Sequence, residues 1–148
     1  MSRIARFGAT AVATALLIGA LPLASTAQVT CTLSGTRGPD ALRGSQGDDT
    51  LCGRGGNDRV AGVRGDDTLL GQDDRDVLLG GGGTDILRGG PGGDTLIGGR
   101  SSDRLDGGRG PDLIDAVGGG SDTVRGGPGR DTCYVGSNDT VSGCEQRV

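Results

Sequence analysis

Gly80-Gly-Gly-Gly-Thr-Asp85-Ile-Leu-Arg88 is followed without a gap by Gly89-Gly-Pro-Gly-Gly-Asp94-Thr-Leu-Ile97. Both stretches follow one nine-residue pattern, with Gly at positions 1 and 4, Asp at position 6 and an aliphatic residue at position 8. The pattern extends in both directions, and its aspartates recur every nine residues at Asp40, Asp49, Asp58, Asp67, Asp76, Asp85, Asp94, Asp103 and Asp112. One residue is inserted after Asp115, and two further units centre on Asp122 and Asp131. A short repeat of this kind predicts a stack of identical structural units.

Each unit predicts a turn followed by a short strand. Gly-x-x-Gly-x-Asp favours a turn because glycine accepts backbone conformations that other residues avoid. The last three residues read x-aliphatic-x, so the middle side chain points inward and its neighbours point outward. Two units, 18 residues, then form one coil. We therefore predict an all-β fold, a parallel β-roll of stacked coils with two parallel sheets and no helix of useful length.

The turn aspartates are the candidate metal ligands. The 18-residue coil places them in a first column (Asp40, Asp58, Asp76, Asp94, Asp112) and a second column (Asp49, Asp67, Asp85, Asp103, Asp122). Carboxylates in a column would lie about 4.8 Å apart, one strand spacing, and would repel one another. Hard cations between successive turns relieve that repulsion, and oxygen-only ligands favour Ca²⁺ over Zn²⁺ or copper. Asp that merely shapes the turns is the alternative, but it does not explain the same position in every unit. The predicted ligands of several Ca²⁺ ions are Asp40, Asp49, Asp58, Asp67, Asp76, Asp85, Asp94, Asp103, Asp112, Asp122 and Asp131.

The units at Asp85, Asp94 and Asp112 resemble the RTX (hemolysin-type) calcium-binding nonapeptide G-G-x-G-x-D-x-U-x. The resemblance implies a β-roll whose turns bind calcium through the sixth-position Asp and the carbonyls of the flanking glycines. Asp74 and Ser101 replace the fourth-position Gly, so the sites around Asp76 and Asp103 are the doubtful ones. Family members often carry a toxin, protease or lipase domain and a C-terminal export signal. We expect an N-terminal signal and no such domain in this chain, so the toxin or hydrolase function is not expected here.

The composition excludes an ordinary enzyme core. The 148 residues include 33 Gly, one Phe, one Tyr and neither Trp nor His. A core of aromatic side chains cannot be built, and without His no side chain titrates near neutral pH unperturbed. No unit carries a nucleophile, a base and an orienting group together, so we expect a protein that is not an enzyme. Disorder is the other reading of such a glycine-rich chain, and we expect it of the calcium-free form.

Residues 1–27 are predicted to be a secretory signal peptide. Arg3 and Arg6 precede an apolar run from Phe7 to Leu21, and cleavage is expected after Ala27. A membrane anchor is the alternative, but the run is short for a span of about 20 residues. The remaining chain holds 13 Arg and 19 acidic residues, a formal charge of −6. We expect a secreted, extracellular protein.

Four cysteines remain after the predicted cleavage, and none forms a Cys-x-x-Cys pair. Two disulfides are therefore favoured over a zinc site. We favour the bridges 31–52 and 133–144, although strict register places Cys31 level with Asp49. The bridges would cap the roll, with an N-terminal cap at 28–34, repeats over 35–142 and a C-terminal cap at 143–148.

The outward strand positions differ between the two faces. Val77, Leu79, Ile97 and Leu113 form an apolar strip on one side. The strip reflects strand propensity or is a contact surface for a second copy or an envelope polymer. Scattered threonines on the other face give only weak support for ice binding. The function we expect is calcium binding coupled to folding, and the alternative is a calcium-dependent adhesin that binds anionic envelope polymers or a protein partner.

Overall fold

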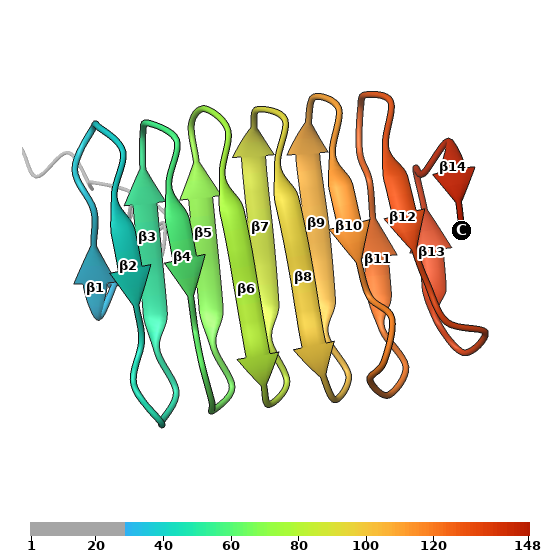
Figure 1. Ribbon diagram of the computed structural model, residues 1–148, viewed down its shortest axis with the longest axis horizontal. Coiled ribbons are helices and arrows are strands. Elements are labelled where there is room, and N and C mark those ends of the chain that lie inside the picture. The colour runs from blue at the N-terminus through green and yellow to red at the C-terminus, as the bar shows by residue number, and fades with distance from the viewer. Residues whose placement is uncertain (1–28) are drawn as a thin grey trace, which may run out of the picture.

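The computed structural model describes residues 29–148 and shows the predicted β-roll (Figure 1). Fourteen strands in this range form two parallel sheets of seven strands each. The first sheet contains β1 (Leu33–Ser34), β3 (Thr50–Arg54), β5 (Thr68–Gln72), β7 (Ile86–Pro91), β9 (Arg104–Arg109), β11 (Thr123–Arg125) and β13 (Thr140–Ser142). The second sheet contains β2 (Ala41–Arg43), β4 (Arg59–Ala61), β6 (Val77–Gly82), β8 (Thr95–Arg100), β10 (Leu113–Asp115), β12 (Thr132–Tyr134) and β14 (Gln146–Arg147). The predicted signal peptide, residues 1–27, lies outside the described residues.

Successive strands alternate between the two sheets, so each coil contributes one strand to each layer (Figure 1). The register confirms the coil length, because Leu69 pairs with Leu87 and Leu78 with Leu96, 18 residues apart. The insertion after Asp115 raises the spacing to 19, as in the pairing of Leu105 with Val124. Residues 29–148 contain no helix that is long and apolar enough to cross a membrane.

The core is a ladder of single aliphatic side chains between the sheets. Each coil contributes two of them, and from Leu51 to Val124 the eighth-position residues are at most 1% exposed. They pack directly on the equivalent side chains of the coils before and after. A core this thin contains little apolar surface per coil, so the turns must supply part of the stability.

The two outer faces differ. Leu79 on β6 pairs with Ile97 on β8. On the next strand, β10, Leu113 pairs with Thr95 and Asp115 pairs with Ile97. The expected strip is therefore not contiguous, because Thr95 and Asp115 interrupt it and Leu113 lies only diagonally from Ile97. The first sheet carries Arg88, Arg104, Asp106 and Arg125 on three neighbouring strands.

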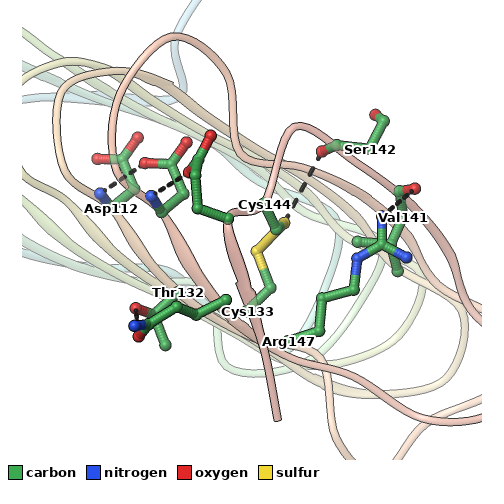
Figure 2. The surroundings of a disulfide bond; sticks show 10 residues. Asp112, Thr132, Cys133, Val141, Ser142, Cys144 and Arg147 are labelled. Carbon is green, nitrogen blue, oxygen red and sulfur yellow. Dashed lines mark hydrogen bonds between the residues drawn. A yellow bond between two sulfur atoms is a disulfide. The ribbon is translucent and has the colours of Figure 1, made fainter.

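Both predicted disulfides are present. Cys31–Cys52 and Cys133–Cys144 each join Cα atoms 6.0 Å apart. Leu33 pairs with Leu51, which places Cys31 level with Asp49, so the first bridge reaches diagonally across the strand. Cys133 points into the core and is fully buried, so the second bridge closes the C-terminal end of the core (Figure 2). At the N-terminal end the inward-facing Leu33 remains 40% exposed.

Candidate metal centre

The turn aspartates form two hydrogen-bonded columns. In each column the main-chain N–H of one Asp donates to Oδ1 of the Asp one coil further on. The N–H of Asp76, for example, donates to Asp94 Oδ1 at 2.8 Å, and that of Asp94 to Asp112 Oδ1 at 2.8 Å. The bonds continue to Asp131 in the first column and to Asp139 in the second. The predicted grouping of the aspartates is thus confirmed, with Asp139 added at its end.

The second carboxylate oxygen has no partner in most of these turns. Seven aspartates have a buried Oδ2 that accepts no hydrogen bond: Asp58, Asp67, Asp76, Asp85, Asp94, Asp112 and Asp131. We call these seven the unpaired aspartates. None of them is more than 3% exposed. Leaving a polar oxygen buried without a partner is costly, and doing so at the same atom of seven units indicates a shared missing ligand.

Each free Oδ2 faces the first-position glycine of its own turn, and a carbonyl of the next coil faces the same point. A Cβ built on Gly107 would lie 2.5 Å from Asp112 Oδ2 and 2.8 Å from the carbonyl oxygen of Gly126. The other unpaired aspartates repeat this arrangement. Because glycine has no Cβ, a carboxylate oxygen and a main-chain carbonyl oxygen can converge closely on its main chain. We call this point of convergence the cradle.

Burial disfavours the charged form of these carboxylates. It raises the pKa of Asp94 to about 7, although the N–H of Asp76 hydrogen-bonds to Asp94 and opposes the change. The neighbouring carboxylates of Asp112 and Asp76 raise it further. Burial likewise raises the pKa of Asp76, Asp85 and Asp112 to about 6. A positive charge in the cradle would reverse this effect, because it favours the ionised carboxylate.

The donor set fits calcium. Within residues 29–148 no three acidic or thiol side chains converge on one point, so a cation would depend on main-chain carbonyls together with one or two carboxylates. Hard oxygen ligands in a flexible arrangement suit Ca²⁺, whereas zinc and copper favour imidazole or thiolate. The unpaired aspartates and the first-position glycine carbonyls are the groups that would hold it. When bound, the ion supplies the positive charge that the buried carboxylates lack.

The first turn of each column differs from the others. The N–H of Thr36 donates to Asp40 Oδ2 and that of Ser45 to Asp49 Oδ2, both at 2.6 Å. The main-chain hydrogen bond from Ser45 lowers the pKa of Asp49. In most later turns the second-position residue takes a positive φ, as at Val63 with φ 102°. The N–H of Val63 donates to the carbonyl oxygen of Gly80 in the next coil at 3.0 Å. Asp40 and Asp49 are therefore partnered within their own turns.

The two doubtful sites differ in the structure. Asp74 adopts φ 76° despite its side chain, and the cradle beside Asp76 keeps both its carboxylate and the Gly89 carbonyl, 2.8 Å from the built Cβ. At Gly98 the three nearest atoms all belong to Asp103, whereas at the first-position glycines beside the unpaired aspartates a carbonyl of the next coil is among the three nearest. One coil further on, Ala116 takes the first position and is 3% exposed in the core. A methyl group thus stands where the turn of Asp122 would need a glycine.

Two further carboxylates end the hydrogen-bonded columns, and the prediction from the sequence did not place them there. The N–H of Asp122 donates to Asp139 Oδ1 at 2.9 Å, and the N–H of Asp131 donates to Glu145 Oε2 at 2.6 Å. Asp139 lies in a shortened unit. Glu145 immediately precedes β14, the place that Asp occupies before β12, and this position before a strand is the signal that could have identified it.

Comparison with known proteins agrees with this geometry. The family description "RTX calcium-binding nonapeptide repeat (4 copies)" matches residues 32–60, 53–87, 61–96, 79–114, 97–133 and 116–141. No curated protein matches the chain, and no solved structure matches it. The matched segments cover nearly all of the described roll and contain every predicted ligand. The chain therefore belongs to the RTX calcium-binding nonapeptide repeat family.

Proposed function

We propose that this chain is a secreted protein whose turns bind several Ca²⁺ ions and that this binding drives folding of the β-roll. The observation that supports the proposal is the set of seven buried Oδ2 atoms without a partner, each of which converges with a carbonyl oxygen of the next coil at a first-position glycine. Membership of a calcium-binding repeat family supports it independently. The proposal assigns the chain no enzymatic role.

The energetic argument follows from the thin core and the buried charge. At neutral pH the carboxylate columns repel and are poorly solvated, which opposes stacking. Chain ordering costs about 1–2 kcal/mol per residue, and two aliphatic side chains per coil offset only part of it. Calcium bound only in the folded state adds stability by mass action. Calcium therefore acts as the folding switch, with the disulfides holding both ends.

A matched pair of variants tests the proposal. Asp94→Asn removes one charge from a cradle but keeps an amide oxygen toward the N–H of Asp76. Asp106→Asn makes the same change on an outer strand, where Asp106 lies 3.9 Å from Arg125 in a surface ion pair of little energetic weight. Equilibrium dialysis should show fewer calcium ions bound by Asp94→Asn and an unchanged number bound by Asp106→Asn. Equal binding by both variants would contradict the proposal.

Export from the cell is the second element of the proposed function. The proposal is that residues 1–27 are removed on export, and the two disulfides of the described chain are consistent with an oxidising compartment. N-terminal sequencing of the protein recovered from culture medium should begin at Gln28. Recovery only from the cell pellet with Met1 intact would contradict export.

The unpaired arginines favour a second candidate function, calcium-dependent adhesion to anionic polymers. Of the arginines in residues 29–148 only Arg125 forms an ion pair with a carboxylate. Seven bound Ca²⁺ ions would change the formal charge of residues 28–148 from −6 to +8. The exposed arginines of the first sheet would then dominate the electrostatic field around the protein. Retention on heparin-agarose should require calcium and should weaken in Arg88→Gln/Arg125→Gln. Retention that is equal in chelator would refute this function.

The apolar strip is the candidate surface for self-association. It comprises Val77, Leu79, Ile97 and Leu113, the last 41% exposed. Leu79→Thr/Ile97→Thr should lower the mass measured by sedimentation equilibrium if two copies pair through this face. An unchanged mass would remove that role.

A further inference from the structure

The C-terminal end of the first column contains a turn that departs from the repeat. β11 ends at Arg125 and β12 begins at Thr132, so six residues form the turn between them. β13 ends at Ser142 and β14 begins at Gln146, which leaves only residues 143–145. Thr132 pairs with Gln146, so Glu145 lies level with Asp131 despite the missing residues. This last turn therefore keeps its first and sixth positions and lacks the middle of the motif.

The shortened turn still supplies the groups found in a complete one. The N–H of Gly126 donates to the carbonyl of Ser142 at 3.0 Å, as first-position glycines do elsewhere in the roll. The carbonyl oxygen of Gly143 and Asp131 Oδ2 both crowd the point where a Cβ on Gly126 would lie, the latter at 2.6 Å. Glu145 Oε2 accepts the N–H of Asp131 at 2.6 Å, in place of the next Asp. A full cradle thus exists where the repeat has already ended.

The side chain of Asp131 indicates independently that a ligand binds at this turn. Its side chain is 0% exposed, and its Oδ2 has no hydrogen-bond partner. The second column ends differently, because Asp139 accepts the N–H of Asp122 on Oδ1 at 2.9 Å and that of Gly136 on Oδ2 at 2.6 Å. Asp139 is a complete hydrogen-bonded cap, whereas Asp131, the last aspartate of the first column, keeps an unsatisfied oxygen.

The disulfide holds this turn in place. Cys144 is the middle residue of the turn and is bonded to the inward-facing Cys133 of β12 (Figure 2). The Gly143 carbonyl, which completes the cradle, and the Glu145 carboxylate, which accepts the N–H of Asp131, belong to the residues on either side of Cys144. The bridge therefore fills the role that the missing middle residues have in other turns.

We propose a terminal Ca²⁺ site formed by Asp131, the Gly143 carbonyl and Glu145, and held together by the Cys133–Cys144 disulfide. The inference rests on the proposed calcium binding and extends it beyond the nonapeptide repeats, into a segment outside the residues matched by the family. Because the bridge positions both added ligands, calcium in this site and the disulfide stabilise each other.

The test compares Glu145→Gln with Asp139→Asn in the oxidised protein. Glutamine keeps an oxygen for the N–H of Asp131 and removes the charge, and circular dichroism in calcium checks that each variant is folded. Equilibrium dialysis at saturating calcium should show one ion fewer for Glu145→Gln and the wild-type number for Asp139→Asn. Cys133→Ser/Cys144→Ser should lose one ion as well.

The second readout is the rate at which each bridge is reduced in calcium. Dithiothreitol breaks the Sγ–Sγ bond to give two thiols and is itself oxidised to its cyclic disulfide. Alkylation and peptide mapping should show Cys133–Cys144 reduced about tenfold faster in Glu145→Gln, within the range of coupling between linked sites, with Cys31–Cys52 unchanged. Wild-type ion number and reduction rate in Glu145→Gln would overturn the terminal site alone. A wild-type protein that binds no calcium would overturn the proposed function and this inference together.

Discussion

Filling one cradle with a methyl group is the sharpest perturbation that the fold allows. In Gly107→Ala the new Cβ would lie 2.5 Å from Asp112 Oδ2 and 2.8 Å from the Gly126 carbonyl. Both are oxygens that would hold an ion, and a Cβ this close would push them apart, so the methyl group disrupts the arrangement of the proposed ligands. Gly82→Ala is the matched control, because a Cβ there meets nothing within 4 Å. Neither glycine has a positive φ, so backbone strain does not separate the two variants.

The expected cost has two parts. Loss of one site with a Kd of about 10⁻⁴–10⁻³ M removes about 1–2 kcal/mol of unfolding free energy at about 5 mM calcium. Overpacking adds about 1–3 kcal/mol, so Gly107→Ala should be less stable than wild type by about 2–5 kcal/mol. Gly82→Ala should stay within about 1 kcal/mol of wild type.

Urea unfolding at a series of calcium concentrations separates the two parts. Near saturation each bound ion contributes about 1.4 kcal/mol of unfolding free energy per tenfold rise in calcium, so a lost site lowers that slope by about 1.4 kcal/mol. Overpacking alone shifts all curves equally and leaves the slope unchanged. A wild-type slope in Gly107→Ala, or an equal loss in Gly82→Ala, would refute the cradle as the ion site.

Three further predictions concern strain, protons and the core. Val63→Gly relieves a positive φ of 102°. It should raise the unfolding free energy in calcium by about 0.5–1 kcal/mol, because the relieved strain exceeds the added entropy of glycine in the unfolded chain. A urea midpoint lower than that of wild type would contradict this. In calcium-free buffer the folded state binds more protons than the unfolded chain, because burial raises the pKa of Asp94 to about 7 and that of Asp85 to about 6. The ion-free fold should therefore be most stable near or below pH 4 and lose stability as the pH rises through 6 to 7, and a β signal in circular dichroism that grows with pH would refute the argument. Leu96→Ala should cost about 2–5 kcal/mol in urea unfolding, while Ile97→Ala on the outer face should cost below about 1 kcal/mol; similar losses would contradict the inward and outward assignment.

Much of the fold follows from the period of the repeat. Aspartates spaced nine residues apart and one aliphatic residue per unit determine both the coil length and which side chains are buried, and Leu69 beside Leu87 confirms the register. The disulfides were predictable because four cysteines near the two ends of a repeat array leave few compact pairings. The insertion after Asp115 was visible in the sequence for the same reason.

The details of individual sites depend on contacts that a repeat does not reveal. The calcium-site prediction treated Asp49 like Asp67. In the structure, however, the N–H of Ser45 donates to the Asp49 carboxylate, whereas the N–H of Val63 donates to a carbonyl of the next coil. Glu145 was missed because its turn is too short for the motif, and only the pairing of Thr132 with Gln146 places it level with Asp131. These differences arise at the ends of the roll, where a unit lacks a neighbour.

The most direct test of the account is far-UV circular dichroism of the oxidised chain from residue 28 onward at neutral pH, titrated with CaCl₂ and in parallel with MgCl₂. The account predicts an expanded chain in chelator and a cooperative change to β structure at sub-millimolar to millimolar calcium, with no such change in magnesium. A spectrum that is already rich in β structure in chelator and indifferent to calcium would contradict it.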